Sequence, residues 1–440
     1  MNTKQDLTTG SISKKLWAFA IPLMCGNIMQ QLYNLVDTWV VGKYIGDNAL
    51  AAVGSAYSLM TFITSVILGL CLGCSAFFSI EFGRHNLKRL RGGKFISFTI
   101  IGILSLIMTA TLLLLNDKII QILQVPNEIH PLISEYLFYI YIGIFASFMY
   151  NYFSNLLRGI GNSIVPLIFL CISVLLNIGL DIYFVAVLNL GIRGAAIATI
   201  ISQYISGIGL MLYSEFHYPE LRINRADIIF DKTIVSDISS LSGLTCLQQS
   251  VMNFGILMVQ GIVNSFGAST MAAFAVAVKI DTLAYMPVQD FGNAFSTFVA
   301  QNFGAGKKNR IRQGIKESLK SVVIFCVLIS ILVFILARPL MLAFTSGNEI
   351  VDIGTRYLRI EGSLYIGIGI LFMLYGYYRA INIPKMSVIL TIISLGIRVL
   401  LSYVLSPIGF IGVTGIWISI PIGWIIADTV GILYYFKTRA

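Results

Sequence analysis

The sequence predicts an all-α membrane protein with twelve transmembrane helices in two six-helix bundles. Of its 440 residues, 57% are hydrophobic and only 11% are charged, whereas soluble domains carry about 25% charged residues. Apolar segments near the ~20 residues that a bilayer requires recur along the whole chain. The second half of the chain also repeats the first. These three observations together exclude an ordinary soluble domain.

The apolar segments define the predicted spans in order. The second, eighth and tenth are long enough to tilt or to extend past the membrane. Prolines 22, 166, 287 and 421 lie within or near spans and predict kinks. The polar first 13 residues contain no apolar stretch of the kind found in signal peptides, so we expect no cleaved signal peptide. The predicted spans are 15–42, 49–80, 95–115, 132–157, 163–188, 192–214, 237–262, 270–302, 315–337, 352–379, 386–406 and 412–436.

The distribution of Lys and Arg predicts the orientation. Of the 30 basic residues, 22 lie on the side of the N-terminus, 6 lie on the opposite side, and Lys279 and Arg398 lie inside spans. Basic loops mark the cytoplasmic face, so we expect both termini in the cytoplasm of a multi-pass protein of the plasma membrane, the inner membrane of a bacterial cell. The net charge of +10 reflects this topology, and we expect no nucleic-acid partner.

An internal repeat divides the chain. Shifted by 221 positions, Phe82-Gly83, Arg89, Arg91 and Gly93 fall on Phe303-Gly304, Arg310, Arg312 and Gly314. Each repeat holds six spans, an even number, so both halves enter the membrane in the same sense. The repeat predicts an N-terminal six-helix lobe (1–214), a polar cytoplasmic linker (215–236) and a C-terminal six-helix lobe (237–440).

The first span carries a polar stripe. Asn27, Gln30, Gln31, Asn34 and Asp37 recur at spacings of three and four, so they share one helix face. An ionisable group inside a bilayer costs about 3 kcal/mol or more at its centre and therefore suggests a functional site. Asp37 is such a group, although a carboxyl that only bridges two helices would give the same pattern.

The charges inside the spans do not follow the repeat. Asp37 falls on Met258, Asp181 on Ser402 and Asn177 on Arg398, so the two lobes differ in chemistry. A helix rises 1.5 Å per residue. This rise predicts that four polar residues of the first lobe lie at a common depth in the outer half of the membrane: Asp37, Asn177, Asp181 and Thr199. Two carboxyls with an amide and a hydroxyl can hold a proton, or bind Na⁺ at Asp37 and Asp181. A protonated Asp bonded to Asn is the structural alternative.

The second lobe offers a different set of charges. Lys279 and Arg398 can pair with Asp281, Glu361 or Asp428 in a network that joins helices. Glu361 sits early in an otherwise apolar span, where it could face a cavity and a cationic substrate. Polarizable Met surfaces adapt to many ligands, so span 7 also contributes candidates. The candidate substrate-cavity residues are Gln30, Gln31, Asn34, Gln248, Met252 and Glu361.

The sequence gives no sign of an enzyme. We find no metal-ligand cluster, nucleophile elbow or phosphate loop. Cys71 and Cys74 form a CxxC within an apolar span, where packing is the simpler interpretation. The three histidines, His85, His130 and His217, are scattered in connecting loops. We therefore expect no catalytic residues, no cofactor and no metal beyond a coupling ion.

Several motifs resemble one transporter family. QNFGAGK at 301–307, LRGIGN at 157–162, YRAINIPK at 378–385 and NIGLD at 177–181 are similar to loop and span motifs of the multidrug and toxic compound extrusion (MATE) family. Their joint spacing, the chain length and the repeat extend the resemblance over essentially the whole chain. Glu361 departs from it, because an apolar residue is common at that position.

The resemblance implies efflux of lipophilic or cationic organic compounds by antiport with H⁺ or Na⁺. It implies a cavity between two lobes that opens alternately to each side, bends in spans 1 and 7, and a cation site made of Asp37, Asn177, Asp181 and Thr199. We expect a monomer surrounded by lipid that binds small molecules. A flippase of lipid-linked precursors is the nearest alternative, and a membrane enzyme or receptor is a more distant one.

Overall fold

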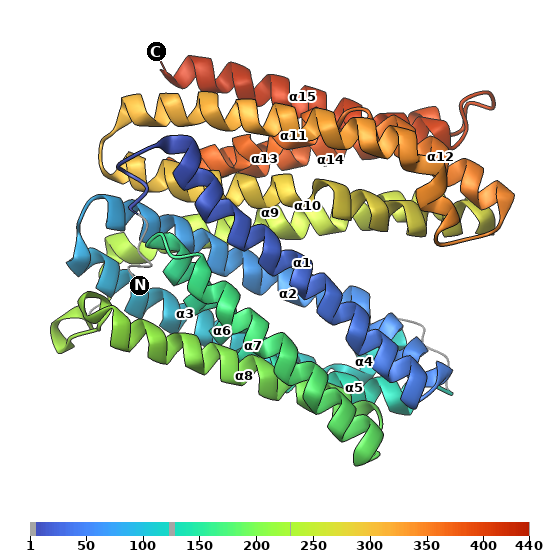
Figure 1. The fold of residues 1–440 in the computed structure, drawn as a ribbon, viewed down its shortest axis with the longest axis horizontal. Coiled ribbons are helices and arrows are strands. Elements are labelled where there is room, and N and C mark those ends of the chain that lie inside the picture. Colours follow the sequence, from blue (N-terminus) through green and yellow to red (C-terminus); the bar gives the residue numbers. More distant parts are fainter. Residues whose placement is uncertain (1–5, 123–127, 229, 440) are drawn as a thin grey trace. The chain divides into compact units, whose positions relative to one another are not determined.

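A computed structural model describes residues 6–122, 128–228 and 230–439, and within these ranges every regular element is a helix. The all-α fold class is therefore confirmed. The chain separates into two compact units. Unit 1 consists mainly of Ile21–Cys246, and unit 2 consists of Leu7–Ala20 together with the chain from Leu247 onward. The helices of each unit can be followed by label and colour in Figure 1.

The first half of the chain contains most helices of unit 1. They are α1 (Ile12–Tyr44), α2 (Asp47–Gly83), α3 (Leu87–Leu114), α4 (Asn116–Ile122), α5 (His130–Ile142), α6 (Ile144–Gly159), α7 (Ile164–Asp181), the π-helix η1 (Ile182–Val187) and α8 (Ile192–His217). Within unit 1, α2 packs against α6, and α8 packs against both α6 and α7.

The second half contains most helices of unit 2. They are α9 (Lys232–Asn264), α10 (Ala268–Gly304), α11 (Lys308–Leu342), α12 (Asn348–Gly362), α13 (Tyr365–Ala380), α14 (Pro384–Leu405) and α15 (Thr414–Arg439). Here α10 packs against α13, and α15 packs against both α13 and α14.

The internal repeat is present at the level of whole helices. α2 and α10 are both 37 residues long and begin 221 positions apart. α6 and α13 are both 16 residues long and begin at the same interval. The packing partners correspond as well, since α2 with α6 matches α10 with α13. The two units are thus two copies of one helical arrangement.

Two predicted spans are broken helices. The span predicted at 132–157 consists of α5 and α6, which meet at a bend of 41°, and the span predicted at 352–379 consists of α12 and α13, with a bend of 53°. The breaks fall at Gly143 and at Ser363–Leu364, which are equivalent positions in the two repeats. Neither break contains a proline, whereas the helices continue through Pro22, Pro287 and Pro421.

Within the described ranges, nine helices are long and apolar enough to cross a membrane, or up to eleven if each bent pair is one span. α1 is not among them, although its 33 residues are sufficient for a span. Its amide and carboxyl side chains lower its mean hydropathy, which is the feature that distinguishes it in the sequence. Many large apolar side chains point outward, among them Leu114, Leu328 and Ile335, as expected of helices that face lipid.

The first segments of α1 and α9 each belong to a different unit from the rest of their helix. Residues 7–20 cluster with unit 2 although α1 continues into unit 1, and residues up to Cys246 cluster with unit 1 although α9 continues into unit 2. The predicted lobes assign residues 7–20 to the first lobe and residues 237–246 to the second. The boundaries of the compact units differ from those lobes at both segments.

The segment between α8 and α9 is fastened to α3. It contains two 3₁₀ turns, Pro219–Leu221 and Arg225–Asp227. Lys94 forms an ion pair with Glu215, and Arg91 Nε donates to Asp227 Oδ2 at 2.8 Å. Burial acts to raise the pKa of Asp227, but the hydrogen bonds from Arg91 and from the Asn224 backbone amide bring it below its usual value. The predicted linker is therefore part of unit 1 over most of its length.

The first part of α9 approaches α2 closely through two glycines of α2. A Cβ built on Gly73 would lie 2.5 Å from the Leu241 carbonyl oxygen and from Ser242 Cα, and one on Gly69 would lie 2.6 Å from Cys246 Cα. The neighbouring Cys74 Sγ and Ser242 Oγ are 3.0 Å apart. Small residues of this kind let helix backbones approach each other in a membrane.

We expect Gly73→Ala to destabilise the protein, because the added methyl group meets backbone atoms that cannot move aside. Overpacking of this kind costs about 1–3 kcal/mol. Gly54 lies in the same helix, and a Cβ there would meet nothing within 4 Å, so Gly54→Ala is the matched control. The midpoint of thermal unfolding in detergent should fall for Gly73→Ala alone. Equal midpoints for both variants would show that the close contact is unimportant.

Candidate cation site

The four polar residues that we expected at one depth lie together in unit 1. Asp37 is a half-buried residue of α1, Asn177 and Asp181 are fully buried one turn apart on α7, and Thr199 is a half-buried residue of α8. Helical spacing places Asn177 and Asp181 on the same face of α7. α1, which is far from α7 and α8 in the sequence, therefore presents its polar side chains to theirs.

Hydrogen bonds link these side chains into one group. Of the two orientations of the Asn177 amide, one satisfies both of its polar atoms: its nitrogen donates to Asp181 Oδ2 at 2.9 Å, and its oxygen accepts from the Thr199 backbone N–H at 3.3 Å. The other orientation gives a bond to Thr199 Oγ1 at 3.4 Å. The hydroxyl groups of Tyr33 and Thr199 are 3.1 Å apart, so Thr199 contacts residues of both α1 and α7.

The carboxyl groups of Asp37 and Asp181 lie close enough to each other for a hydrogen bond. Two carboxylates have no hydrogen to share, so such a bond forms only when one of the two groups carries a proton. Asp37 Oδ1 and Asp181 Oδ1 are both buried, and neither accepts a hydrogen bond from a donor in the described part of the chain. The pair therefore has the composition of a site that can hold one proton.

The backbone changes its winding at this site. Asp181 is the last residue of α7, and the π-helix η1 begins at the next residue. Single turns of π-helix are rare and frequently occur at functional sites. At the equivalent position of unit 2, α14 continues as an α-helix through Ser402 to Leu405. The irregular winding therefore accompanies the acidic residue and is absent where serine replaces it.

Two tyrosines of the site were not predicted. Tyr33 precedes Asp37 by one helical turn on α1 and contacts Thr199. Tyr136 of α5 is buried and lies within electrostatic range of Asp37, Asp181 and Tyr33. The i, i+4 spacing of Tyr33 and Asp37 was visible in the sequence. Tyr136 left no comparable signal, because it lies in an apolar segment with other aromatic residues.

The candidate cavity residues of α1 differ from Asp37 in their exposure. Gln30, Gln31 and Asn34 are exposed, whereas Asp37 is half-buried. The polar stripe therefore divides into a part that meets α7 and α8 and a part that is open. Gln248 and Met252 belong to unit 2, where Gln248 is buried and Met252 is half-buried.

Unit 2 contains a buried acidic cluster around Glu361. Glu361 and Asp281 are both nearly inaccessible, and their carboxyl groups lie close to each other. Tyr365 donates to Asp281 Oδ1 at 2.6 Å, and Tyr357 lies close to Glu361. The positive charge of Arg398 acts on both acids. Of the two intramembrane cations, Arg398 therefore lies near these acids, while Lys279 is exposed.

Neither acidic group resembles a transition-metal centre. No set of three or more His, Cys, Asp or Glu side chains in the described part of the chain is placed to hold a metal ion. The donors near Asp37 are carboxyl, amide and hydroxyl oxygens, which suit H⁺ or a hard monovalent cation. The donor set of the unit 1 group is therefore compatible with a small cation.

Comparisons with known proteins agree with this arrangement. The model of the MatE family matches residues 22–183 and 245–404. The chain belongs to the MatE family. It is therefore a multi-pass membrane transporter and not an enzyme, and the resemblance to multidrug and toxic compound extrusion transporters seen in the sequence is confirmed.

Individual relatives cover nearly all of the chain. A probable multidrug resistance protein of Bacillus subtilis is 27% identical over 98% of this chain and 96% of its own length. A probable multidrug resistance protein of Thermotoga maritima is 26% identical over 97% and 93%. The solved structure of a transporter from Pyrococcus furiosus superposes with a TM-score of 0.91 at 24% identity, over 97% of this chain and 96% of that one. The fold of these transporters is thus shared along the full chain.

We expect Thr199→Val to weaken the cation site structurally, because it removes the hydroxyl that Tyr33 contacts. Leaving a buried polar group without its partner costs about 1–3 kcal/mol. The control is Thr429→Val, since the exposed Thr429 bonds only to Ile425 of its own helix. Thermal unfolding in detergent should occur at a lower temperature for Thr199→Val. If the two variants unfold at the same temperature, the Tyr33–Thr199 contact does not stabilise unit 1.

Proposed function

We propose that this transporter exports small lipophilic or cationic organic compounds in exchange for an entering cation, H⁺ or Na⁺. The site at Asp37 binds the cation from the outer side. Cation binding favours the state that releases the compound outside, and loss of the cation inside favours the state that binds a new one. Coupling of this kind requires the two ligands to favour different states of the protein.

The observation that carries the proposal is the polar group formed by α1, α7 and α8, in which the carboxyl groups of Asp37 and Asp181 lie close together. The two groups come from different helices, and the charge they carry together changes when a proton enters or leaves. A change of one charge in a poorly polarisable environment has a large effect on how helices pack. Proton binding at this pair can therefore alter the contact between α1 and α7.

Among the two coupling ions, we propose H⁺. The carboxyl pair already has the short-range contact that a shared proton provides. A bound Na⁺ instead needs several oxygen atoms directed at one centre. Tyr33 and Thr199 direct their hydroxyl oxygens at each other, and Asn177 uses both amide atoms within the group. The arrangement supports proton exchange better than cation coordination.

The substrate class rests on relatives and on the exposed part of α1. The named relatives in Bacillus subtilis and Thermotoga maritima are described as probable multidrug resistance proteins. We propose that Gln30, Gln31 and Asn34, together with Gln248 and Met252 of unit 2, contact substrate through hydrogen bonds and adaptable apolar surface. We further propose a monomer in the plasma membrane with both termini in the cytoplasm.

A flippase of lipid-linked precursors receives less support. That function would use a strongly cationic cavity for phosphate groups. Arg398 acts on the carboxyls of Asp281 and Glu361, so its charge is balanced within unit 2. The exposed Lys279 is then the main cation left to favour a phosphate. We therefore place organic compounds ahead of lipid-linked precursors.

We expect Asp37→Asn to abolish efflux that is driven by a gradient while the protein still folds, because an amide in place of the carboxyl cannot gain and lose the proton. The measurement is movement of a fluorescent cationic dye in proteoliposomes under a pH gradient alone and a Na⁺ gradient alone. Asp117 is an exposed acid of α4, and Asp117→Asn should transport normally.

The two gradients separate the possible results. Movement under the pH gradient alone, lost in Asp37→Asn, supports the proposal. Movement under the Na⁺ gradient alone would overturn the choice of ion but not of site. Normal efflux by Asp37→Asn would overturn the role of the carboxyl pair. If the wild-type protein moves no dye under either gradient, lipid-linked compounds become the next substrates to test.

A further inference from the structure

We propose that two arginines related by the internal repeat, Arg89 and Arg310, are positioning residues for transport. Each arginine holds the first segment of a helix that begins in its own unit and continues in the other unit. We call the contacts of Arg310 the unit 2 clamp and those of Arg89 the unit 1 clamp. This proposal rests on the proposed function, because it concerns how the helices move during transport.

The unit 2 clamp holds the backbone before α1. Arg310 Nη1 donates to the Gly10 carbonyl at 2.8 Å, Nη2 donates to the Thr9 carbonyl at 2.8 Å, and both Nε and Nη2 reach the Leu7 carbonyl at 3.2 Å. One guanidinium group thereby engages three carbonyls of four consecutive residues. Residues 7–20 belong to unit 2, so these contacts lie within that unit.

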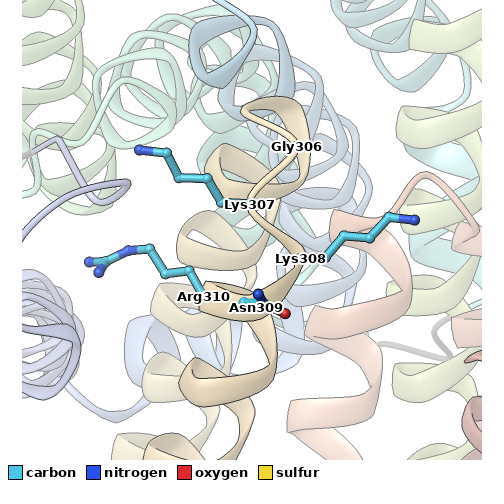
Figure 2. A pocket seen from close by; sticks show the side chains of 5 residues that line it. All are labelled: Gly306, Lys307, Lys308, Asn309 and Arg310. Atoms are coloured by element: carbon cyan, nitrogen blue, oxygen red, sulfur yellow. The ribbon is translucent and has the colours of Figure 1, made fainter.

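Neighbouring side chains complete the unit 2 clamp. Lys307 Nζ donates to the Thr8 carbonyl at 2.9 Å, Gln301 Oε1 accepts from the Leu7 N–H at 3.2 Å, and Asn302 Nδ2 donates to the Leu7 carbonyl at 3.2 Å. Figure 2 shows Lys307 and Arg310 extending to the same side of the chain, while Lys308 extends to the opposite side. The Leu7 side chain is fully buried. The segment is therefore fixed by polar and apolar contacts together.

The unit 1 clamp holds the first part of α9. Arg89 Nη2 forms an ion pair with Asp237 Oδ2, and Arg89 Nε lies 3.3 Å from Oε1 of the buried Glu81. The close approach of Gly69 and Gly73 to α9, described above, lies in the same unit. The first part of α9 is thus held both by the charged contact of Arg89 and by close packing against the glycines of α2.

The two arginines have matching surroundings. The guanidinium of Arg89 lies 6.0 Å from the ring centre of Phe77, and that of Arg310 lies 5.6 Å from the ring centre of Phe298. In both units a Cβ on the glycine four residues later, Gly93 or Gly314, would come within 2.2 Å of that ring. The repeat therefore reproduces the arginine, the ring and the glycine, although one clamp holds carbonyls and the other a carboxylate.

Holding these segments has a mechanical consequence. α1 changes unit between Ala20 and Ile21, and α9 changes unit between Cys246 and Leu247. If the first segments stay fixed, relative motion of the units must bend α1 and α9 near these positions. If they are free, the segments can detach and the helices can move without bending. The clamps therefore determine whether motion of the units is converted into a change within α1, which carries Asp37.

The test compares Arg89→Ala and Arg310→Ala with Lys88→Ala and Arg312→Ala, which remove an equal charge from exposed neighbouring positions. Hydrogen exchange of the full-length protein in nanodiscs reports whether each segment is held. We expect exchange of residues 7–16 to rise at least tenfold in Arg310→Ala alone, and exchange of residues 232–246 to rise in Arg89→Ala alone. Unchanged exchange in both variants would overturn the clamps.

Transport in proteoliposomes then reports whether holding matters. We expect the maximal rate of dye efflux to fall at least fivefold in each arginine variant, with the KM for the dye unchanged and the control variants normal. Arg310→Lys, which keeps the charge but has fewer donors, should be intermediate. In a double-mutant cycle, Asp237→Ala should add little to Arg89→Ala, because the two residues act together. A normal rate despite faster exchange would overturn the positioning role.

Failure of the proposed function gives a different result. In that case the wild-type protein moves no dye, while hydrogen exchange still shows whether Arg89 and Arg310 hold their segments. A general loss of stability is distinguished as well, since it would raise exchange in all helices and lower the amount of dye bound.

Discussion

The lack of hydrogen-bond partners in lipid is the constraint on which both units depend. A polar side chain deep in a span must find its partner on another helix of the protein, because leaving it in hydrocarbon is costly. Unit 1 meets the constraint with two acids, an amide and two hydroxyls around Asp181. Unit 2 meets it with two acids, two tyrosines and an arginine around Glu361. The same scaffold thus encloses two groups of different composition.

The difference between the groups explains why only one resembles a cation site. In unit 2, Arg398 occupies the repeat position of Asn177 and supplies a fixed positive charge to the acids. In unit 1 that position is an uncharged amide, and under the proposed function an exchangeable cation takes the corresponding role. A tethered cation favours helix association, whereas an exchangeable one allows a cycle of binding and release. The asymmetry of residues noted in the sequence therefore has a physical meaning.

Much of the fold was predictable because the sequence repeats. The interval of 221 positions places α2 on α10 and α6 on α13 with equal lengths. The broken spans at Gly143 and Leu364 were not predicted, because neither break contains a proline. The convergence of Asp37, Asn177, Asp181 and Thr199 followed from helical rise and register. Tyr33 and Tyr136 did not, because a tyrosine in an apolar segment also fits plain packing. The π-helix after Asp181 has no sequence signature of its own.

The exchange of helix segments between units has a consequence for the order of events during synthesis. Residues 7–20 leave the ribosome among the first. The side chains that hold Leu7 include those of Gln301 and Arg310, which are made about three hundred residues later. Unit 1 likewise lacks its last segment until Cys246 has been added. All of unit 1 has therefore been made before the main part of unit 2 begins at Leu247. Unit 2 is completed only when the second half of the chain joins a segment that was made at the very start.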